Sequence, residues 1–222
     1  MKRSIIACLV ICFCAGFVLM SCNKDKDAPG NSSVTSIHAI VVNGTSFDLD
    51  IAKAYLRPED TDIEYLVGEG VYKNGEFTIQ LPDNVPDDYL VGFDFPEWAN
   101  SSDKNINGGI ILLEGYKSDE YVDNFNYGKF DLSSITIKAT VGLYTYVDKD
   151  VKISGKHSEK NELGINTTLS YNVSLKKGWN IMFVSLNFSI AALSIDLTTS
   201  NPGGMKWYFA NDDFDFDFNF GF

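Results

Sequence analysis

Residues 135–154 decide the fold class, and they read ITIKATVGLYTYVDKDVKIS. The first thirteen are rich in β-branched and aromatic side chains, which favour strands because they pack well on a pleated surface. Asp148, Lys149 and Asp150 then form a polar turn signal, and residues 151–154 begin a second extended run. The stretch therefore predicts two strands joined by a turn.

The same pattern continues on both sides of this stretch. Phe47, Leu49 and Ile51 alternate with polar or small residues, and residues 76–81 alternate likewise after the turn signal Asn74-Gly75. A period of two indicates strands rather than helices. Because turn signals recur at short intervals, we predict an all-β chain folded as an antiparallel β-sandwich, with a closed β-barrel as the alternative. The further extended runs are at residues 163–175, 179–188, 189–199 and 205–210.

Two less regular stretches divide the predicted strands into two parts. Residues 100–109 are polar and rich in glycine, and residues 116–128 have a looser pattern. We therefore expect an N-terminal β-sandwich part at residues 35–115 and a C-terminal part at residues 129–222. We expect two sub-domains that share an interface, with one large sandwich as the alternative.

The beginning of the chain carries an export signal. Lys2 and Arg3 precede an uncharged, mostly apolar run at residues 5–20, which leads into Leu19-Met20-Ser21-Cys22. This tetrapeptide resembles the lipobox of bacterial lipoproteins. The resemblance implies that residues 1–21 are removed as a signal peptide and that Cys22 carries acyl chains such as palmitate. The alternatives are an ordinary secretory signal and an anchor helix, although the run is shorter than the roughly 20 residues that span a bilayer.

Residues 22–34 are predicted to be a flexible tether between the lipid and the domain, because they are rich in Asn, Asp, Lys, Ser and Gly. The alternating Lys and Asp residues after Cys22 resemble the charged tag of surface-exposed lipoproteins of Gram-negative gut anaerobes. The expected location is the outer membrane, with a lipid anchor and exposure at the cell surface. Each buried methylene contributes about 0.8 kcal/mol, so several acyl chains would hold the protein there almost permanently.

Three internal sequence segments show the same resemblance. Residues 74–82 (NGEFTIQLP), 146–153 (YVDKDVKI) and 175–180 (LKKGWN) are similar to segments of uncharacterised lipoproteins from these bacteria. Such proteins are all-β surface modules with immunoglobulin- or transthyretin-like folds. The resemblance implies this fold and no enzymatic activity, because the family has no catalytic motif to carry over.

Charge and cysteine content exclude several classes of function. The chain has 18 basic and 30 acidic residues, and loss of Lys2 and Arg3 with the signal leaves a net charge of −14. No basic stripe remains to contact phosphates, so nucleic acid is excluded as a partner. Three of the four cysteines lie within residues 1–21, so the mature chain keeps only Cys22 and is expected to have no disulfide.

The sequence contains no catalytic or metal-binding motif. His38 is predicted to be a hydrogen-bonded strand residue, and His157 to lie in a solvated turn at residues 155–161. Two isolated histidines without a thiol do not make a zinc site. The acidic positions of residues 213–219 lack the glycine and the glutamate of an EF-hand loop. We expect no enzyme activity, no cofactor and no metal, with a glycosidase that uses only carboxylates as the alternative.

Aromatic residues supply the candidate ligand contacts. Trp98 lies in a predicted loop and is the candidate ligand-binding residue, whereas Trp179 and Trp207 are predicted to anchor the core. At residues 214–222 phenylalanine occupies every second position, so a strand would place all these rings on one face. We expect this tail to be a last strand that packs on the core.

Two functions follow from these features. The preferred one is a non-enzymatic binding module on the cell surface, with a glycan or a host-derived ligand as the favoured class. Its contact region would be the loop around Trp98 and the tyrosine-rich residues 116–127. The alternative is a structural or assembly subunit of a surface fibre or complex, in which strands are exchanged with a partner protein at exposed sheet edges.

Overall fold

The computed structural model describes residues 34–58, 63–133, 135–160 and 164–209. Apart from two single 3-10 turns, η2 (Gly44–Ser46) and η3 (Asp87–Tyr89), the regular elements in these ranges are strands. The all-β prediction is therefore confirmed, and the sheets form an open sandwich that does not close into a barrel. Within the same ranges, no helix has the length and apolar character that crossing a bilayer requires.

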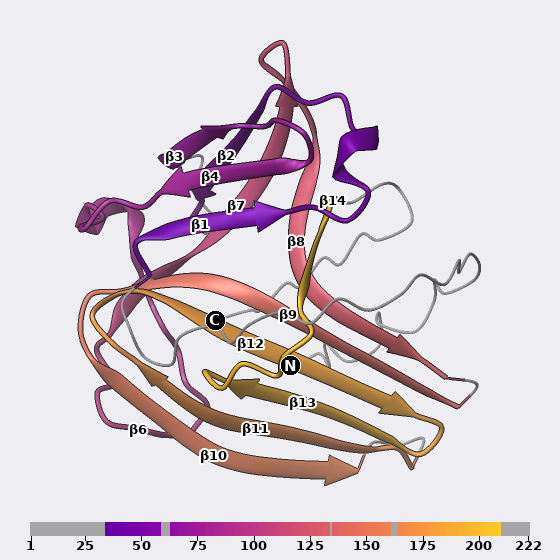
Figure 1. The fold of residues 1–222 in the computed structure, drawn as a ribbon. Coiled ribbons are helices and arrows are strands. Elements are labelled where there is room, and N and C mark those ends of the chain that lie inside the picture. Colours follow the sequence, from indigo (N-terminus) through magenta and orange to yellow (C-terminus); the bar gives the residue numbers. More distant parts are fainter. Residues whose placement is uncertain (1–33, 59–62, 134, 161–163, 210–222) are drawn as a thin grey trace.

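The strands form an upper and a lower layer in the view of Figure 1. The upper layer contains β1 (Ser36–Ile40), β2 (Ile51–Leu56), β3 (Tyr65–Val71) and β4 (Glu76–Gln80). The lower layer contains β9 (Thr136–Val147), β10 (Val151–Lys160), β11 (Asn166–Leu175), β12 (Gly178–Ser189) and β13 (Ala192–Thr198). Two long strands, β7 (Asn107–Lys117) and β8 (Glu120–Leu132), pass from one layer to the other. The short strands are β5 (Val91–Gly92), β6 (Asn100–Ser101) and β14 (Lys206–Phe209).

One sheet of 12 strands runs through both layers. Its order is β3-β2-β7-β8-β9-β12-β13-β11-β10-β6, with β5 beside β7 and β14 beside β8. The later half of β7 pairs with β2 and β8, while its residues 108–110 pair with β9. Among the described strands, every pairing except that of β11 with β13 is antiparallel. Apart from β1 and β4, the two layers are therefore parts of one folded sheet.

β1 and β4 form a separate two-stranded sheet that packs on the inner side of β2 and β3. Ile37 of β1 and Ile79 of β4 are fully buried in this packing. Two glycines of β3 permit the close approach of the backbones. A Cβ atom at Gly70 would lie 2.2 Å from the carbonyl oxygen of Thr78, and one at Gly68 would lie 2.8 Å from that of Gln80. No side chain fits at either position.

The main core lies between the two layers and is rich in aromatic rings. Phe77, Phe125 and Trp207 pack there with ring centroids 4.7 to 5.9 Å apart. Trp179 of the lower layer joins them, and its Nε1 donates a 2.7 Å hydrogen bond to the carbonyl oxygen of Pro82. Because Trp179 and Trp207 are only 3% and 6% exposed, the prediction that both anchor the core is confirmed.

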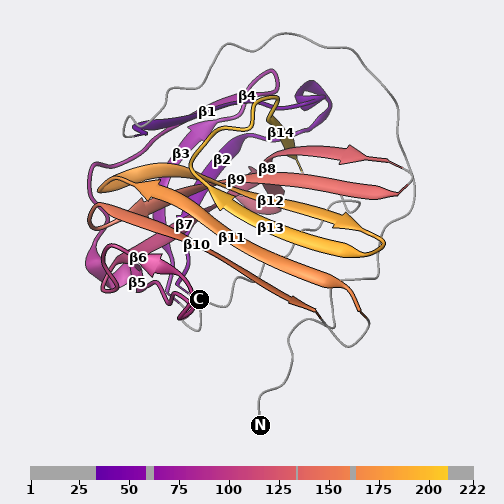
Figure 2. The ribbon, with the colours of Figure 1, turned by 90° about the horizontal axis from the view of Figure 1, so that it is seen from below.

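A second apolar cluster lies on the opposite side of the lower layer. Along β12, Trp179 and Ile181 belong to the main core, whereas Met182 and Val184 belong to the second cluster. The segment that contains β5 and β6 covers this side at one end of the sheet (Figure 2). A small cavity of about 20 Å³ remains between them and is lined almost entirely by apolar side chains. Its size is close to that of a single water molecule, so it does not accommodate a larger ligand.

Several elements differ from the predicted ones. Residues 47–50 alternate in sequence but form no strand. Phe47 and Leu49 still pack at the main core, and Asp48 and Asp50 both hold Lys117. Residues 116–128 form the end of β7, a turn at residues 118–119 and the first part of β8, rather than a loose connection. The continuous sheet contains strands from residues 35–115 and strands from residues 129–209. The two sub-domains that share an interface stay a prediction.

Candidate functional site

The outer side of the upper layer carries a network of charged and aromatic side chains. Pairing of β3, β2, β7 and β8 sets the register, and the alternate residues Ala52, Ala54 and Leu56 point into the main core. We name the opposite side the outward face, since side chains alternate along each strand. It consists of three rows: Leu66, Tyr55 and Leu112; Glu69, Lys53, Glu114 and Asn124; and Val71, Ile51, Tyr116 and Tyr121.

Glu114 is the unusual member of the outward face, because only 3% of it is exposed. Arg57 donates from Nη1 to Oε1 of Glu114 and from Nη2 to Oε2 at 3.2 Å. The Tyr116 hydroxyl donates to the same Oε2 at 2.6 Å. Arg57 also donates from Nε to the Glu64 carboxylate at 3.2 Å. Both oxygens of Glu114 are therefore occupied by charge-assisted hydrogen bonds.

Two cations lie over tyrosine rings of this network. The Nζ of Lys53 is 4.3 Å from the ring centroid of Tyr116, and the Cζ of Arg57 is 5.0 Å from that of Tyr55. At such distances the negative face of an aromatic ring attracts a cation. The contacts hold the rings and the charged groups in one arrangement around Glu114.

The network also fixes the protonation of its members. The hydrogen bond to Glu114 raises the pKa of Arg57 above its usual value, so the guanidinium stays charged. Burial, and then the hydrogen bond to Glu114, raises the pKa of the Tyr116 hydroxyl, which therefore remains a donor at neutral pH. Arg57 and Tyr116 therefore both remain hydrogen-bond donors to Glu114.

Apolar side chains with open surface adjoin the network on the outward face. Leu66 and Leu112 are each 44% exposed, and Tyr121 is 51% exposed. The Tyr121 ring meets that of Tyr116 edge-on, with centroids 6.1 Å apart. Small-molecule sites combine apolar and aromatic surface with a few fixed polar groups, and the outward face has both.

Trp98 lies far from this network, just before β6 at the second cluster. It is half-buried, and its ring lies nearly parallel to that of His157, with centroids 5.6 Å apart and planes 18° apart. Tyr171 contacts it as well, with ring centroids 5.2 Å apart. The prediction that His157 lies in a turn is wrong, because β10 continues through residue 160. Trp98 is therefore fixed against β10 and β11.

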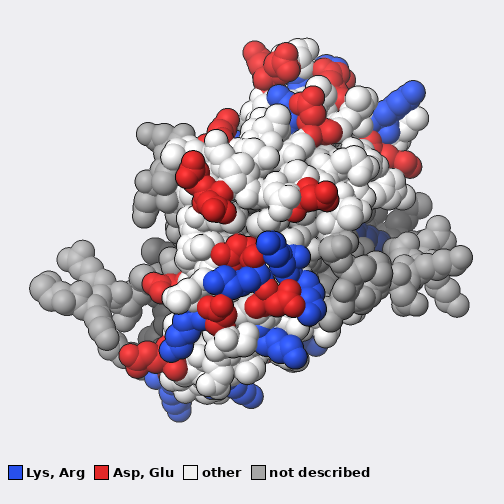
Figure 3. All heavy atoms as spheres, turned by 90° about the vertical axis from the view of Figure 1, so that its left-hand side faces the viewer, with Lys and Arg blue, Asp and Glu red and all other residues white. Residues whose placement is uncertain are grey.

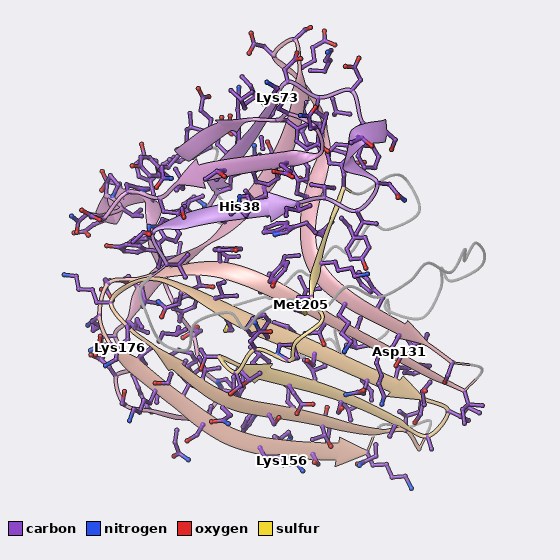
Figure 4. The ribbon with its side chains drawn as sticks, viewed as in Figure 1. His38, Lys73, Asp131, Lys156, Lys176 and Met205 are labelled. Atoms are coloured by element: carbon purple, nitrogen blue, oxygen red, sulfur yellow. The ribbon has the colours of Figure 1, made fainter. Side chains whose placement is uncertain are left out.

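The remaining candidate residues divide into those the structure describes and those it does not. The Nδ1 of His38 lies 3.0 Å from the Thr78 hydroxyl on the surface of β1 and β4, so the predicted strand role is confirmed (Figure 4). Cys22 and residues 213–222 lie outside the described residues. Within the described part of the chain, no three His, Cys, Asp or Glu side chains gather in a way that could hold a metal ion.

Sequence reasoning singled out Tyr116 and Tyr121 within residues 116–127 but missed Lys53, Arg57 and Glu114. One signal was available for two of these. Lys53 is the only charge in IAKAYL, and Glu114 is the only charge in the apolar run GIILLEGY. A lone charge within a strand needs a partner if it is buried. The sequence alone could not show that β2 and β7 would be neighbours.

Several charges elsewhere on the described surface form exposed pairs. In the view of Figure 3, acidic and basic side chains interleave across the middle of the molecule. The turns of the lower layer supply two such pairs, Lys176 with Asp150 at 2.7 Å and Lys149 with Asp103 at 3.4 Å. Exposed pairs of this kind contribute little to stability and form no enclosed site.

Comparison with other proteins gives no relative for this chain. No protein-family profile matches it. No curated protein matches it. No solved structure matches it either. A proposal for its function therefore rests on the sequence and on the geometry described above.

Proposed function

We propose that the chain is a lipid-anchored surface protein that binds a glycan, without catalysis, through the outward face of the upper layer. The lipobox that ends at Cys22 supports the anchor. The tether predicted at residues 22–34 adjoins the fold, since β1 begins at Ser36 and Val34 already donates a hydrogen bond to the carbonyl oxygen of Trp179. The binding face would then project from the membrane on a short tether.

Burial of Glu114 is the observation that carries the proposed binding site. Removal of a carboxylate from water is costly unless it is paired and hydrogen-bonded, and an apolar residue is often as stable at such a position. The network instead fixes Arg57, Tyr116 and Glu114 beside the exposed surfaces of Leu112 and Tyr121. Sugars present hydroxyl groups and apolar C–H faces, so a rigid polar network beside aromatic surface suits them.

The hydrogen bonds of Glu114 favour binding over hydrolysis. A glycosidase that uses two carboxylates needs one that gives up a proton and one that receives it or attacks the sugar. The oxygens of Glu114 are occupied by Arg57 and Tyr116, and the raised pKa of Arg57 keeps its charge in place. Such a carboxylate positions its neighbours and is not free to react.

The edge of the lower layer gives less support to assembly through exchanged strands. Within the described residues, β10 pairs with β6 only at Ile153 and Ser154, so residues 155–160 have an open edge. Lys156, Glu159 and Lys160 lie along this edge, and Figure 4 shows Lys156 there. Charged side chains on an edge oppose pairing with another chain. We therefore prefer binding to assembly.

Binding of the detergent-solubilised full-length protein to a panel of neutral and acidic polysaccharides tests the proposal. In affinity electrophoresis, one or more polysaccharides should retard the wild type, and Tyr121→Ala should reduce this by about tenfold with an unchanged melting temperature. Trp98→Ala is the matched control and should leave the retardation intact. Loss of binding in Trp98→Ala alone would place the site at the second cluster. No binding to any polysaccharide, or release of shortened chains, would contradict the proposal.

A further inference from the structure

In the part of the lower layer away from β5 and β6, one face of the sheet is polar and the other is apolar. On one face, neighbouring strands align Thr140, Ser185, Asp196 and Ser170 in a row. The hydroxyls of Thr140 and Ser185 are 2.9 Å apart, and Ser170 donates to the Asp196 carboxylate. This face is polar and internally hydrogen-bonded, as expected for a face in contact with water.

The reverse face of the same strands is apolar. The pairing aligns Leu186, Ile195 and Leu169 in one row and Ile137, Phe188 and Leu193 in the next. We name these six residues the distal apolar face. They continue the second cluster beyond Val184 and Leu197, and Ile195 packs directly against that cluster.

The described elements cover only the nearer part of this side. Phe93, Phe95 and Trp98 pack on the second cluster, at the end of the sheet that holds Val151 and Leu175. Among the described elements, β13 is in substantial contact only with its sheet neighbours β11 and β12. A contiguous apolar patch of this kind in a soluble domain marks a surface that something else covers.

Residues 210–222 are the segment of this chain that fits the distal apolar face. Phenylalanine occupies every second position from 214 to 222, and Asp, Asn or Gly lies between. As a strand the segment would be apolar on one side and polar on the other. Residues 214–222 as a strand would extend about 26 Å, while β9 to β11 spans about 14 Å at ordinary strand spacings. The segment is therefore long enough to cover the face.

β14, the last described strand, touches the border of this face through Tyr208. Phe130 of β8 pairs with Ala139, which pairs with Leu186, so Phe130 lies on the same side of the sheet as the distal apolar face. The ring of Tyr208 in β14 packs edge-on against Phe130, with centroids 5.6 Å apart. β14 runs antiparallel to β8 toward Phe125, so its last residue, Phe209, packs against Phe125 and Phe47, and residues 210–213 would have to lead back to the face.

We propose that residues 211–222 dock on the distal apolar face of the same chain, with the phenylalanines against the sheet and the acidic residues toward solvent. The segment would complete the cover that the region around β5 and β6 begins. This inference concerns the lower layer and does not depend on glycan binding at the outward face.

Photo-crosslinking of the full-length protein in membranes tests the docking. Phe218 is replaced by benzoylphenylalanine, an analogue that keeps the aromatic ring, and crosslinked peptides are mapped by mass spectrometry after irradiation. The expected crosslinks join residue 218 to β9, β12, β13 or β11 within one chain. The same photoreactive residue at position 217 is the matched control, because its side chain would point away, and it should give at least tenfold fewer of these crosslinks.

Two substitutions on β13 make the test specific for the face. Ile195→Asp should reduce the crosslinks several-fold, whereas Ser194→Asp, the adjacent residue on the polar face, should leave them unchanged. Crosslinked products of twice the mass would show that the segment of a second copy is the occupant and would overturn the proposal. Equal yields from positions 217 and 218, or crosslinks only to other elements, would overturn it as well.

Discussion

The hydroxyl of Tyr116 donates a 2.6 Å hydrogen bond to the carboxylate of Glu114, two positions earlier on β7. Residues separated by two positions share one face of a strand, so the strand itself brings the pair together. Arg57 then reaches the same carboxylate from the end of the neighbouring strand β2. The local pair and the tertiary ion pair thus form one network. Substitution of one member should therefore change the effect of substituting another.

Arg57→Met should lower the free energy of unfolding by about 2–3 kcal/mol, because it leaves the buried Glu114 carboxylate without its cation. The loss is below that of a fully buried pair, since the Arg57 side chain is 37% exposed. Adding Glu114→Gln should recover part of it. Urea denaturation measures both effects, with Lys176→Met at the exposed pair with Asp150 as a control that should leave the midpoint unchanged. A double variant less stable than Arg57→Met would contradict the expected coupling.

Alkaline pH should destabilise the fold through its buried tyrosines. Burial raises the pKa of the Tyr144 hydroxyl, and burial with the hydrogen bond to Glu114 raises that of Tyr116. The unfolded chain then loses these protons first, near the usual pKa of about 10. Stability should be complete below about pH 10 and should fall as the pH rises above it. Urea midpoints measured at increasing pH should show this fall, and Tyr144→Phe should flatten it. An equal slope in Tyr144→Phe would show that other groups cause it.

Gly70→Ala should destabilise the upper layer strongly, because its Cβ would lie 2.2 Å from the Thr78 carbonyl oxygen. The two backbones would have to separate, and we expect a loss of about 3 kcal/mol or more. Gly92→Ala is the matched control, since its Cβ would have no neighbour closer than 3.7 Å. Its effect should stay within about 0.5 kcal/mol. Similar thermal unfolding of the two variants would mean that β3 and β4 do not pack so closely.

Trp179→Ala should cost about 3–5 kcal/mol, the usual range for emptying a buried aromatic site. Its indole also donates to the Pro82 carbonyl oxygen, which would lose that partner. Trp98→Ala should cost less, about 1–2 kcal/mol, because Trp98 is only half-buried. Chemical denaturation ranks the two variants, and a larger loss in Trp98→Ala would contradict the assignment of the main core.

Cys22→Ala should abolish lipid attachment, because acylation of a lipobox cysteine requires its thiol. Metabolic labelling with a fatty-acid analogue should mark the wild type in its native membrane and not the variant. Ser33→Ala, within the predicted tether, is a control that should keep the label. Label that persists in Cys22→Ala would refute the lipid anchor.

The strands of the lower layer were largely predictable from sequence. Residues 135–147, 163–175, 179–188 and 189–199 closely match β9, β11, β12 and β13, because alternation of side chains along a strand is a local property. Residues 47–50 show the limit of this reasoning. They alternate as well, with Phe47 and Leu49 at the main core and Asp48 and Asp50 at Lys117, yet they form no strand.

The candidate site was predictable only in part. The tyrosine-rich residues 116–127 include Tyr116 and Tyr121, whose place on the outward face follows from their own strands. Arg57 and Glu114 are 57 positions apart, and only the pairing of β2 with β7 brings them together. Trp98 was expected in an open loop, but the unexpected length of β10 placed His157 beside it.

The sequence by itself determined the all-β class and the face that each side chain takes within its strand, because both follow from a repeat of two residues. The tertiary structure alone decided which strands became neighbours, including the parallel pairing of β11 with β13 and the passage of β7 from one layer to the other. Strand partners are chosen by the packing of distant apolar faces against one another, and no local pattern records that choice. Burial of Glu114 beside Arg57 is a consequence of that packing.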